Sequence, residues 1–200
     1  MSNAPQQTTI VPTDTPSSSV PSTVQPRPQN VPSPAPASNN GRNSYRQAPR
    51  DRNQASKLNS TSVETDINQG LTYHRQRNYQ QAISSYSRAI ALNPNSVEAY
   101  SNRAAAYNEQ KDYQKAIADS SKAISLNPTY VNAYINRGLA YYYQGNSQQA
   151  IVDYTKAIEL APNNANAYNI RALAYARLGN QQAAQADKRK AAALSRQQPQ

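Results

Sequence analysis

The chain offers few side chains that could catalyse a reaction. It contains no cysteine, which excludes a thiol nucleophile, a disulfide framework and a cysteine zinc site. Its single histidine, His74, follows Tyr73 without an acidic neighbour to orient it, so an exposed or groove-lining histidine is favoured over a catalytic base. No G-x-x-x-x-G-K-S/T loop, G-x-G-x-x-G loop or metal-spaced ligand cluster occurs. We therefore predict a chain without catalytic residues, cofactor or metal ion.

Recurring asparagines suit a different chemistry, that of binding. Asn68, Asn102 and Asn136 lie 34 residues apart, and Ile170 takes the next place. Asparagine is a poor helix former, which costs roughly 0.5 kcal/mol relative to alanine inside a helix. Because its carboxamide both donates and accepts, a row of asparagines suits the main-chain amides of an extended peptide. Two alternatives remain open: the repeats inherited one residue from a common ancestor, or these side chains simply face water.

The same interval of 34 residues organises the rest of the chain. Pro94, Pro128 and Pro162 close successive units, which run 63–96, 97–130, 131–164 and 165–198. Each unit has a small residue eighth, a tyrosine eleventh, and alanines twentieth and twenty-seventh. These spacings of three, four and seven predict two amphipathic helices per unit. The turns between paired helices are expected near 77–78, 111–112, 145–146 and 179–180.

These positions resemble the tetratricopeptide repeat family over residues 63 to about 194. The resemblance implies an all-α, right-handed α-α superhelix (a tetratricopeptide repeat solenoid) of about four helix-turn-helix repeats. Asp66 departs from the pattern, where later units carry Tyr100, Tyr134 and Tyr168, as an end unit without an earlier neighbour permits. Lys188 and its polar surroundings depart from it too, and we interpret the second helix of the last unit as a polar cap.

The first helix of each unit is expected to line a concave groove. Core residues occupy positions four, seven, eight and eleven, which places positions two, six, nine and thirteen on the opposite face. The third and fourth units are more apolar on that side than the second, so side chains of a ligand would anchor there. Including rim residues, the predicted peptide-binding set is Asn68, Asn102, Asn136, Leu71, Ile135, Leu139, Tyr142, Tyr143 and Leu173.

Two specific family functions can be compared with these residues. The asparagines are similar to those of O-GlcNAc transferase repeat domains, which grip a peptide main chain, although no transferase catalytic domain is present in the sequence. Residues 100–107 are similar to part of the clamp domains that hold the C-terminal carboxylates of chaperones. The five clamp places correspond here to Ile67, Leu71, Asn102, Asn132 and Asn136. Every cation is missing, so carboxylate capture of that kind is not expected.

The N-terminal part differs sharply in composition from the repeats. Ten of the fourteen prolines lie within residues 1–49, and residues 1–58 show no apolar periodicity. Too little hydrophobic surface is available there to offset roughly 1–2 kcal/mol of backbone entropy per residue, which predicts a disordered tail or linker. Without a leader sequence or an apolar stretch of ~18 residues, a soluble cytoplasmic protein is the default expectation. The tail also resembles the linker of a larger protein.

Charge leaves one further alternative. The formal net charge is +10, and the basic residues are densest at 42–52 and 188–190. Either stretch could contact nucleic acid or an acidic protein. Within the second helices, the acidic residues Asp119, Asp153 and Asp187 each precede a lysine by three positions, at Lys122, Lys156 and Lys190. We expect exposed pairs there, worth a few tenths of a kcal/mol each.

The sequence therefore favours a non-catalytic scaffold or adaptor that holds an extended peptide or a helix of a protein partner in the groove. One alternative is a regulatory repeat module of a larger enzyme, of the kinase or transferase type. A weaker alternative is a nucleic-acid-associated adaptor that uses the basic tail. The partner, the cellular process and the oligomeric state are not encoded in any pattern described above.

Overall fold

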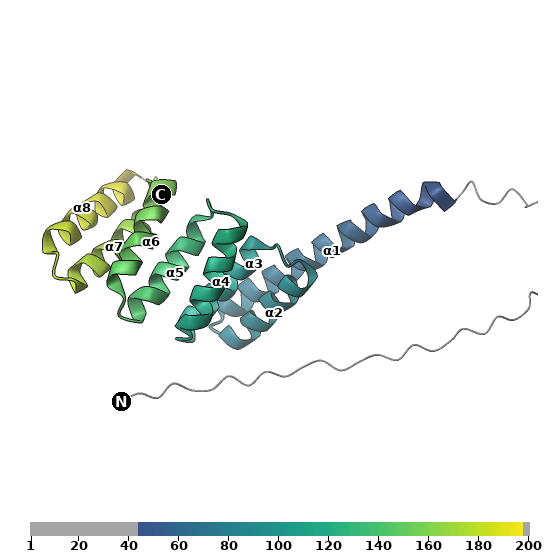
Figure 1. The fold of residues 1–200 in the computed structure, drawn as a ribbon, viewed down its shortest axis with the longest axis horizontal. Helices are drawn as coiled ribbons and strands as arrows, with labels where there is room; N and C mark the ends of the chain where they lie inside the picture. The colour runs from purple at the N-terminus through teal and green to yellow at the C-terminus, as the bar shows by residue number, and fades with distance from the viewer. Residues whose placement is uncertain (1–43, 198–200) are drawn as a thin grey trace, which may run out of the picture. The chain divides into compact units, whose positions relative to one another are not determined.

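The computed structural model describes the backbone of residues 44–197 and the side chains of residues 60–197. Over that range the chain is entirely α-helical, in four antiparallel pairs joined by short turns (Figure 1). The helices are α1 (Ser44–Arg75), α2 (Tyr79–Leu92), α3 (Val97–Glu109), α4 (Tyr113–Leu126), α5 (Val131–Tyr143), α6 (Ser147–Leu160), α7 (Ala165–Arg177) and α8 (Gln181–Gln197). The predicted all-α repeat fold is confirmed.

Each turn within a pair has the same construction. The second-last residue before the next helix adopts a positive φ, at Arg77 (59°), Lys111 (63°), Gly145 (88°) and Gly179 (79°). An asparagine or aspartate follows, and its side chain caps the next helix by accepting from a backbone N–H three residues later. Left-handed backbone favours glycine, so the two cationic residues at this place hold a more strained turn than the two glycines.

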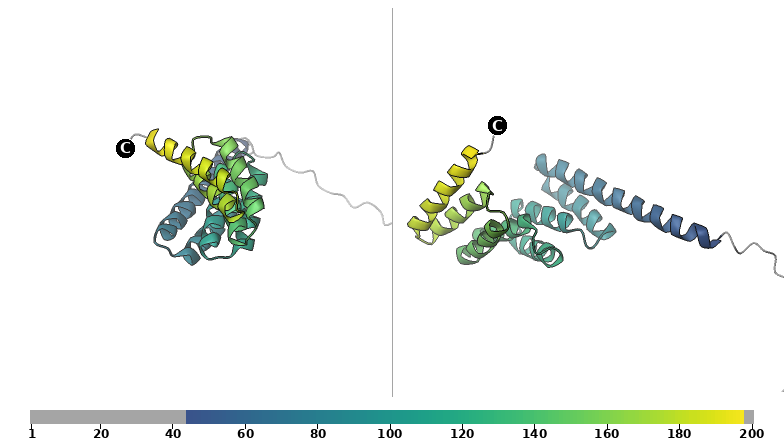
Figure 2. Two further views of the ribbon diagram at one scale, coloured as in Figure 1. Left: turned by 90° about the vertical axis from the view of Figure 1, so that its left-hand side faces the viewer. Right: turned by 90° about the horizontal axis from the view of Figure 1, so that it is seen from above.

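The pairs stack in chain order, with α1 and α2 at one end and α7 and α8 at the other (Figure 2). Each second helix packs against its own first helix, and α2, α4 and α6 also pack against the first helix of the following unit. The first helices also contact one another in series, from α1 to α3 to α5 to α7. One wall of the stack therefore consists of first helices, as the positions in the sequence predict.

The core is built mainly from alanine and tyrosine. Tyr86 and Tyr154 are almost completely buried, and each ring lies against a glycine on the paired first helix, Gly70 or Gly138. A methyl group at either glycine would collide with that ring. The small eighth residue of these units therefore makes room for an aromatic ring at position twenty-four, which explains why tyrosine is tolerated in so thin a layer.

Helix α1 extends into the segment predicted as a tail, residues 1–58. It begins at Ser44, so the backbone of residues 44–58 is helical. Gln54, Ala55, Lys57 and Leu58 are good helix formers, and they continue a helix whose later turns are already fixed by packing from Val63 onward. The remainder of the predicted tail, 1–43, lies outside the described residues.

The predicted exposed pairs between aspartates and lysines are wrong. Asp119, Asp153 and Asp187 are buried, and each binds an arginine of the paired first helix. In the third unit, Nη2 and Nε of Arg137 lie 2.7 Å and 2.9 Å from the two carboxylate oxygens of Asp153. The second and fourth units repeat this two-pronged bond with Arg103 and Arg171. Burial favours the guanidinium, whose planar fork matches a carboxylate, over a flexible lysine.

These arginines also connect neighbouring repeats. The remaining nitrogen of each guanidinium donates to a hydroxyl on the second helix of the preceding unit: Arg103 to Ser87, Arg137 to Ser121 and Arg171 to Thr155, over 2.9 to 3.2 Å. Three helices therefore meet at each arginine. Each of the three guanidinium nitrogens therefore has a hydrogen-bond partner, and the buried carboxylate has its countercharge.

The first and last units depart from this scheme. In the first, Gln69 and Ser85 replace the arginine and the aspartate, and Arg88 of α2 instead binds Asp66, Gln69 and Ser85. Asp66, a departure from the repeat pattern, thus has an ionic partner. In the last unit, α8 buries one side and exposes Lys188 and its basic neighbours on the other.

Candidate peptide-binding groove

Two pockets lie on the wall formed by the first helices. Each includes some of the predicted groove positions: the first pocket has residues at positions nine and thirteen, and the second has residues at positions two and six. The first, which we call the Tyr143 pocket, has a volume of about 190 Å³ and is lined by Asn108, Glu109, Lys111, Tyr113, Leu139 and Tyr143. The second, the Glu64 pocket, has a volume of about 320 Å³ and is lined by Ser60, Val63, Glu64, Ile67, Asn68, Asn93, Ser96 and Glu98.

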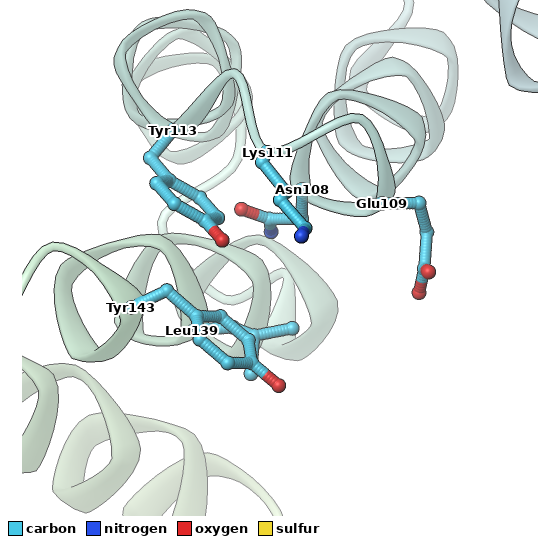
Figure 3. Close-up of a pocket in the computed structure, with 6 residues that line it drawn as sticks. All are labelled: Asn108, Glu109, Lys111, Tyr113, Leu139 and Tyr143. Carbon is cyan, nitrogen blue, oxygen red and sulfur yellow. The ribbon is translucent and has the colours of Figure 1, made fainter.

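The Tyr143 pocket lies where α3, α4 and α5 meet (Figure 3). Tyr113, the first residue of α4, and Tyr143, the last residue of α5, have nearly parallel rings, with centroids 5.6 Å apart and planes inclined by 15°. Tyr143 is 54% exposed, although it is a large aromatic residue. Leu139 supplies the apolar floor, one turn earlier on α5. The pocket therefore has aromatic and apolar walls on the α5 side.

Polar groups occupy its other side. Asn108 is 6% exposed, and its Nδ2 donates to the backbone oxygen of Asn136 over 2.8 Å. Its Oδ1 is buried and accepts no hydrogen bond from any described residue. Leaving a buried acceptor without a donor costs roughly 1–3 kcal/mol, so such atoms call for an explanation. In Figure 3 this carboxamide, the Lys111 ammonium and the Tyr113 hydroxyl converge on the same gap.

The three predicted asparagines differ in how far they are available to a ligand. Asn68 is exposed and lines the Glu64 pocket, and Asn102 is half-buried. Asn136 instead donates from Nδ2 to both the backbone oxygen and the Oγ of Ser101, over 2.9 Å and 3.2 Å. Its amide protons therefore tie α5 to α3. Of the three predicted asparagines, only Asn68 and Asn102 therefore keep a carboxamide that is available to a ligand.

The predicted apolar residues separate into two groups. Leu71, Ile135 and Tyr142 are half-buried and pack against core clusters. Leu139 and Tyr143 line the Tyr143 pocket, and Leu173 on α7 is 49% exposed. The second group is thus the one that presents apolar surface to a ligand.

Tyr142 is also occupied by a cation from the next repeat. The Arg177 guanidinium lies 5.1 Å from the centre of its ring, and Nη1 of Arg177 donates to its backbone oxygen over 2.8 Å. The junction between α5 and α7 is therefore filled by a side chain of the protein itself.

His74 has an acidic neighbour that the sequence analysis missed. Its ring meets that of Tyr79 edge to face at 5.3 Å, and the Tyr79 hydroxyl donates to Oε2 of Glu109 over 3.3 Å. Burial lowers the His74 pKa below its usual value, and the negative charge of Glu109 partly opposes that change. Glu109 belongs to the following repeat, 35 positions further along the sequence. No group of three metal-ligating side chains gathers within the described range.

The sequence analysis also missed three residues of the Tyr143 pocket: Asn108, Lys111 and Tyr113. They occupy positions twelve, fifteen and seventeen of the second unit, which are not among the groove positions two, six, nine and thirteen that helical periodicity predicts. One signal was available. Lys111 stands where the third and fourth units have Gly145 and Gly179, and a bulky residue at a turn that favours glycine is unusual enough to examine.

Comparison with protein families decides the class of the chain. A tetratricopeptide repeat model matches residues 97–130 and 131–164, and two related models, described as TPR repeat and tetratricopeptide repeat, match 70–111 and 153–186. The chain belongs to the tetratricopeptide repeat family. No curated protein matches the sequence. Within the described range, none of the helices of this repeat protein has the length and apolar character needed to cross a membrane.

Solved structures of other proteins are similar to this chain. A crystal structure of MamA is 31% identical, with a TM-score of 0.62, and the match covers 72% of this chain and 84% of that one. The first repeat domain of Spaghetti (RPAP3), bound to the HSP90 peptide SRMEEVD, is 31% identical, with a TM-score of 0.58. The match covers 60% of this chain and 95% of that domain. The second repeat domain of human RPAP3, in complex with the HSP70 peptide SGPTIEEVD, is 27% identical, with a TM-score of 0.55. The match covers 58% of this chain and 97% of that domain. The repeat array is a protein-interaction module.

Proposed function

We propose that this chain is a non-catalytic scaffold or adaptor that holds an extended segment of a protein partner against α1, α3, α5 and α7. The observation that carries the proposal is the position of the two pockets. Both lie on the wall of first helices, and residues at the predicted groove positions line each of them. A segment running along the wall would meet one pocket after the other.

The groove offers hydrogen bonds to a peptide main chain and contacts to its side chains. Asn68 and Asn102 present carboxamides at equivalent places on α1 and α3, where each can donate to a peptide oxygen and accept from a peptide N–H. Leu139, Tyr143 and Leu173 present apolar surface further along the wall. Main-chain bonds at one end and side-chain anchoring at the other would fix both the direction and the register of the segment.

The charge of the groove argues against an acidic C-terminal ligand of the kind bound by the RPAP3 domains. Ile67, which stands at one of the cationic or amide places of a carboxylate clamp, is buried in the core with Leu71 packed against it. Glu64, Glu98 and Glu109 also line the two pockets. A carboxylate-rich segment would meet like charges there, so a neutral or basic segment is the better match.

The test uses a peptide selected from a random display library on the full chain, with affinity measured by fluorescence anisotropy. The double variant Asn68→Ala with Asn102→Ala should weaken binding about tenfold or more, because each lost hydrogen bond is worth roughly 0.5–1.5 kcal/mol. Asn163→Ala, an exposed asparagine in the turn before α7, is the matched control and should bind normally. Failure to select any peptide, or unchanged affinity of the double variant, would contradict the proposal.

A further inference from the structure

We propose that the Tyr143 pocket receives the side chain of an arginine of the bound segment. The inference rests on the proposed function, because the arginine would belong to the peptide that the groove holds. It adds a chemical identity to one anchor point. It also predicts which residue a partner must carry.

The first argument is the unpaired acceptor. Oδ1 of Asn108 is buried without a hydrogen bond from any described residue, while the Nδ2 of the same carboxamide is held by α5. The Nδ2 end is therefore held in place, and Oδ1 is left available to a donor that a ligand brings. The Tyr113 hydroxyl makes no hydrogen bond to another described residue, and its ring stacks on that of Tyr143. Arginine carries five N–H donors and no acceptor.

The second argument is the form of the walls. A guanidinium is flat, and cations bind favourably against the face of a tyrosine ring. Tyr113 and Tyr143 stack on each other with centroids 5.6 Å apart, and Tyr143 is more than half exposed, so part of its ring surface remains accessible to a cation. Glu109 also lines the pocket, but Figure 3 shows its carboxylate apart from the gap between Tyr113 and Tyr143, and it accepts from the Tyr79 hydroxyl. The unpaired acceptor and the aromatic surface together fit arginine better than lysine, which lacks the planar fork.

The third argument is an equivalent junction one repeat further along. Between α5 and α7, Arg177 lies over the ring of Tyr142 and donates to its backbone oxygen. Arg177 holds position thirteen of its unit, and Tyr142 holds position twelve of the preceding one. At the α3 and α5 junction the same two positions carry Tyr143 and Asn108. The chain provides no arginine there, and the Tyr143 pocket lies at that place.

The charge of Lys111 predicts the direction in which arginine affinity changes when this residue is replaced. Lys111 is exposed, lines the mouth of the pocket and carries the same charge as the proposed ligand. Removing that charge should therefore strengthen binding of arginine. If the pocket instead took a glutamine or asparagine side chain, whose oxygen would accept from the Lys111 ammonium, the same change would weaken binding.

The first experiment avoids the need for a known partner. The full chain labelled with ¹⁵N is titrated with N-acetyl-arginine amide, up to about 50 mM, and with the corresponding citrulline and lysine compounds. Arginine should shift the amide signals of residues 108–113 and 139–143, with about five- to tenfold higher affinity than citrulline or lysine. Equal affinities, or shifts elsewhere in the chain, would overturn the inference.

Variants locate the effect within the pocket. Tyr143→Ala should weaken arginine binding about three- to tenfold, and Lys111→Gly should strengthen it about two- to threefold. Lys111→Gly reproduces the turn of Gly145, so loss of the fold is not expected. Glu159→Gln, an exposed residue of α6, is the control for a change of surface charge and should change nothing. Weaker binding by Lys111→Gly would contradict an arginine ligand.

The display library separates this inference from the proposed function. If peptides are selected and arginine is enriched at one position on the native chain but not on Tyr143→Ala, both ideas stand. If peptides bind through Asn68 and Asn102 without arginine enrichment, the inference fails and the scaffold function remains. If no peptide binds, the proposed function fails, while the titration with the blocked amino acids still decides what enters the pocket.

Discussion

The first and third repeats pack the same pair of helices with different polar contacts. In the third, Arg137 and Asp153 are 21% and 2% exposed at the side chain, and the guanidinium also reaches the preceding repeat. In the first, Arg88 and Asp66 are 50% and 15% exposed, and the arginine comes from the second helix of the pair. An internal repeat has a neighbour on each side and buries its charges, whereas the first repeat leaves its arginine in water. In both repeats the ion pair joins the two helices of one pair, but only in the internal repeat does the arginine also bind the preceding repeat.

The largest expected effect is on the buried pair. Arg137→Ala leaves the Asp153 carboxylate buried without its partner, and we expect a loss of roughly 3–5 kcal/mol in the free energy of unfolding. Arg88→Ala removes a half-exposed partner and should cost only about 1 kcal/mol or less. Urea unfolding followed by circular dichroism measures both variants.

A double variant sharpens the same comparison. Arg137→Met with Asp153→Leu removes both charges and should recover most of the stability lost in Arg137→Ala, because no unpaired charge remains. Equal losses for Arg137→Ala and Arg88→Ala would show that burial of the pair does not matter and that the comparison of the two repeats is wrong.

An intermediate effect is expected at the asparagines of position six. Asn136→Ala breaks the bonds from α5 to Ser101 on α3 and should reduce stability by about 1–2 kcal/mol. Asn68→Ala, at the same place in the first repeat, removes an exposed side chain and should leave the melting temperature unchanged within error. Thermal melting of the two variants side by side tests whether the same residue is structural in one repeat and available to a ligand in the other.

The smallest effect concerns position twelve, which is His74 in the first repeat and Tyr142 in the third. Burial lowers the pKa of His74 in the folded state below the value of about 6.5 expected when unfolded. Between the lowered pKa and about pH 7 the unfolded chain therefore binds more protons than the folded one. The free energy of unfolding should fall slightly as the pH drops through this range. His74→Tyr should remove this contribution. Melting curves of the two proteins between pH 7.5 and 5 would test it, and identical pH profiles would contradict it.

The sequence was sufficient for the fold because the repeat is encoded locally. The alanines and tyrosines at fixed intervals determine which side of each helix is buried, and the positions of Arg77, Lys111, Gly145 and Gly179 mark the turns. The helical extension of α1 back to Ser44 was missed, since it lies among residues whose composition is typical of disorder.

The polar contacts were harder to predict, because their partners lie on other helices. Asp153 was assigned to Lys156 three positions away, but it binds Arg137 sixteen positions earlier. Asn136 was assigned to a ligand, but it binds Ser101 of the previous repeat. Periodicity identifies the face on which a side chain lies. It does not identify what that side chain meets on the neighbouring repeat, and Asn108 was missed for the same reason.

The central claim is that the wall of first helices holds an extended segment of another protein. Its most direct test is cross-saturation NMR on the complex of the full chain with a display-selected peptide, which reports the amides that lie against the ligand. We predict transfer to residues of α1, α3 and α5 around Asn68, Asn102, Leu139 and Tyr143. Transfer confined to α2, α4 and α6, whose residues lie away from both pockets except at Tyr113 and the turns, would contradict the account.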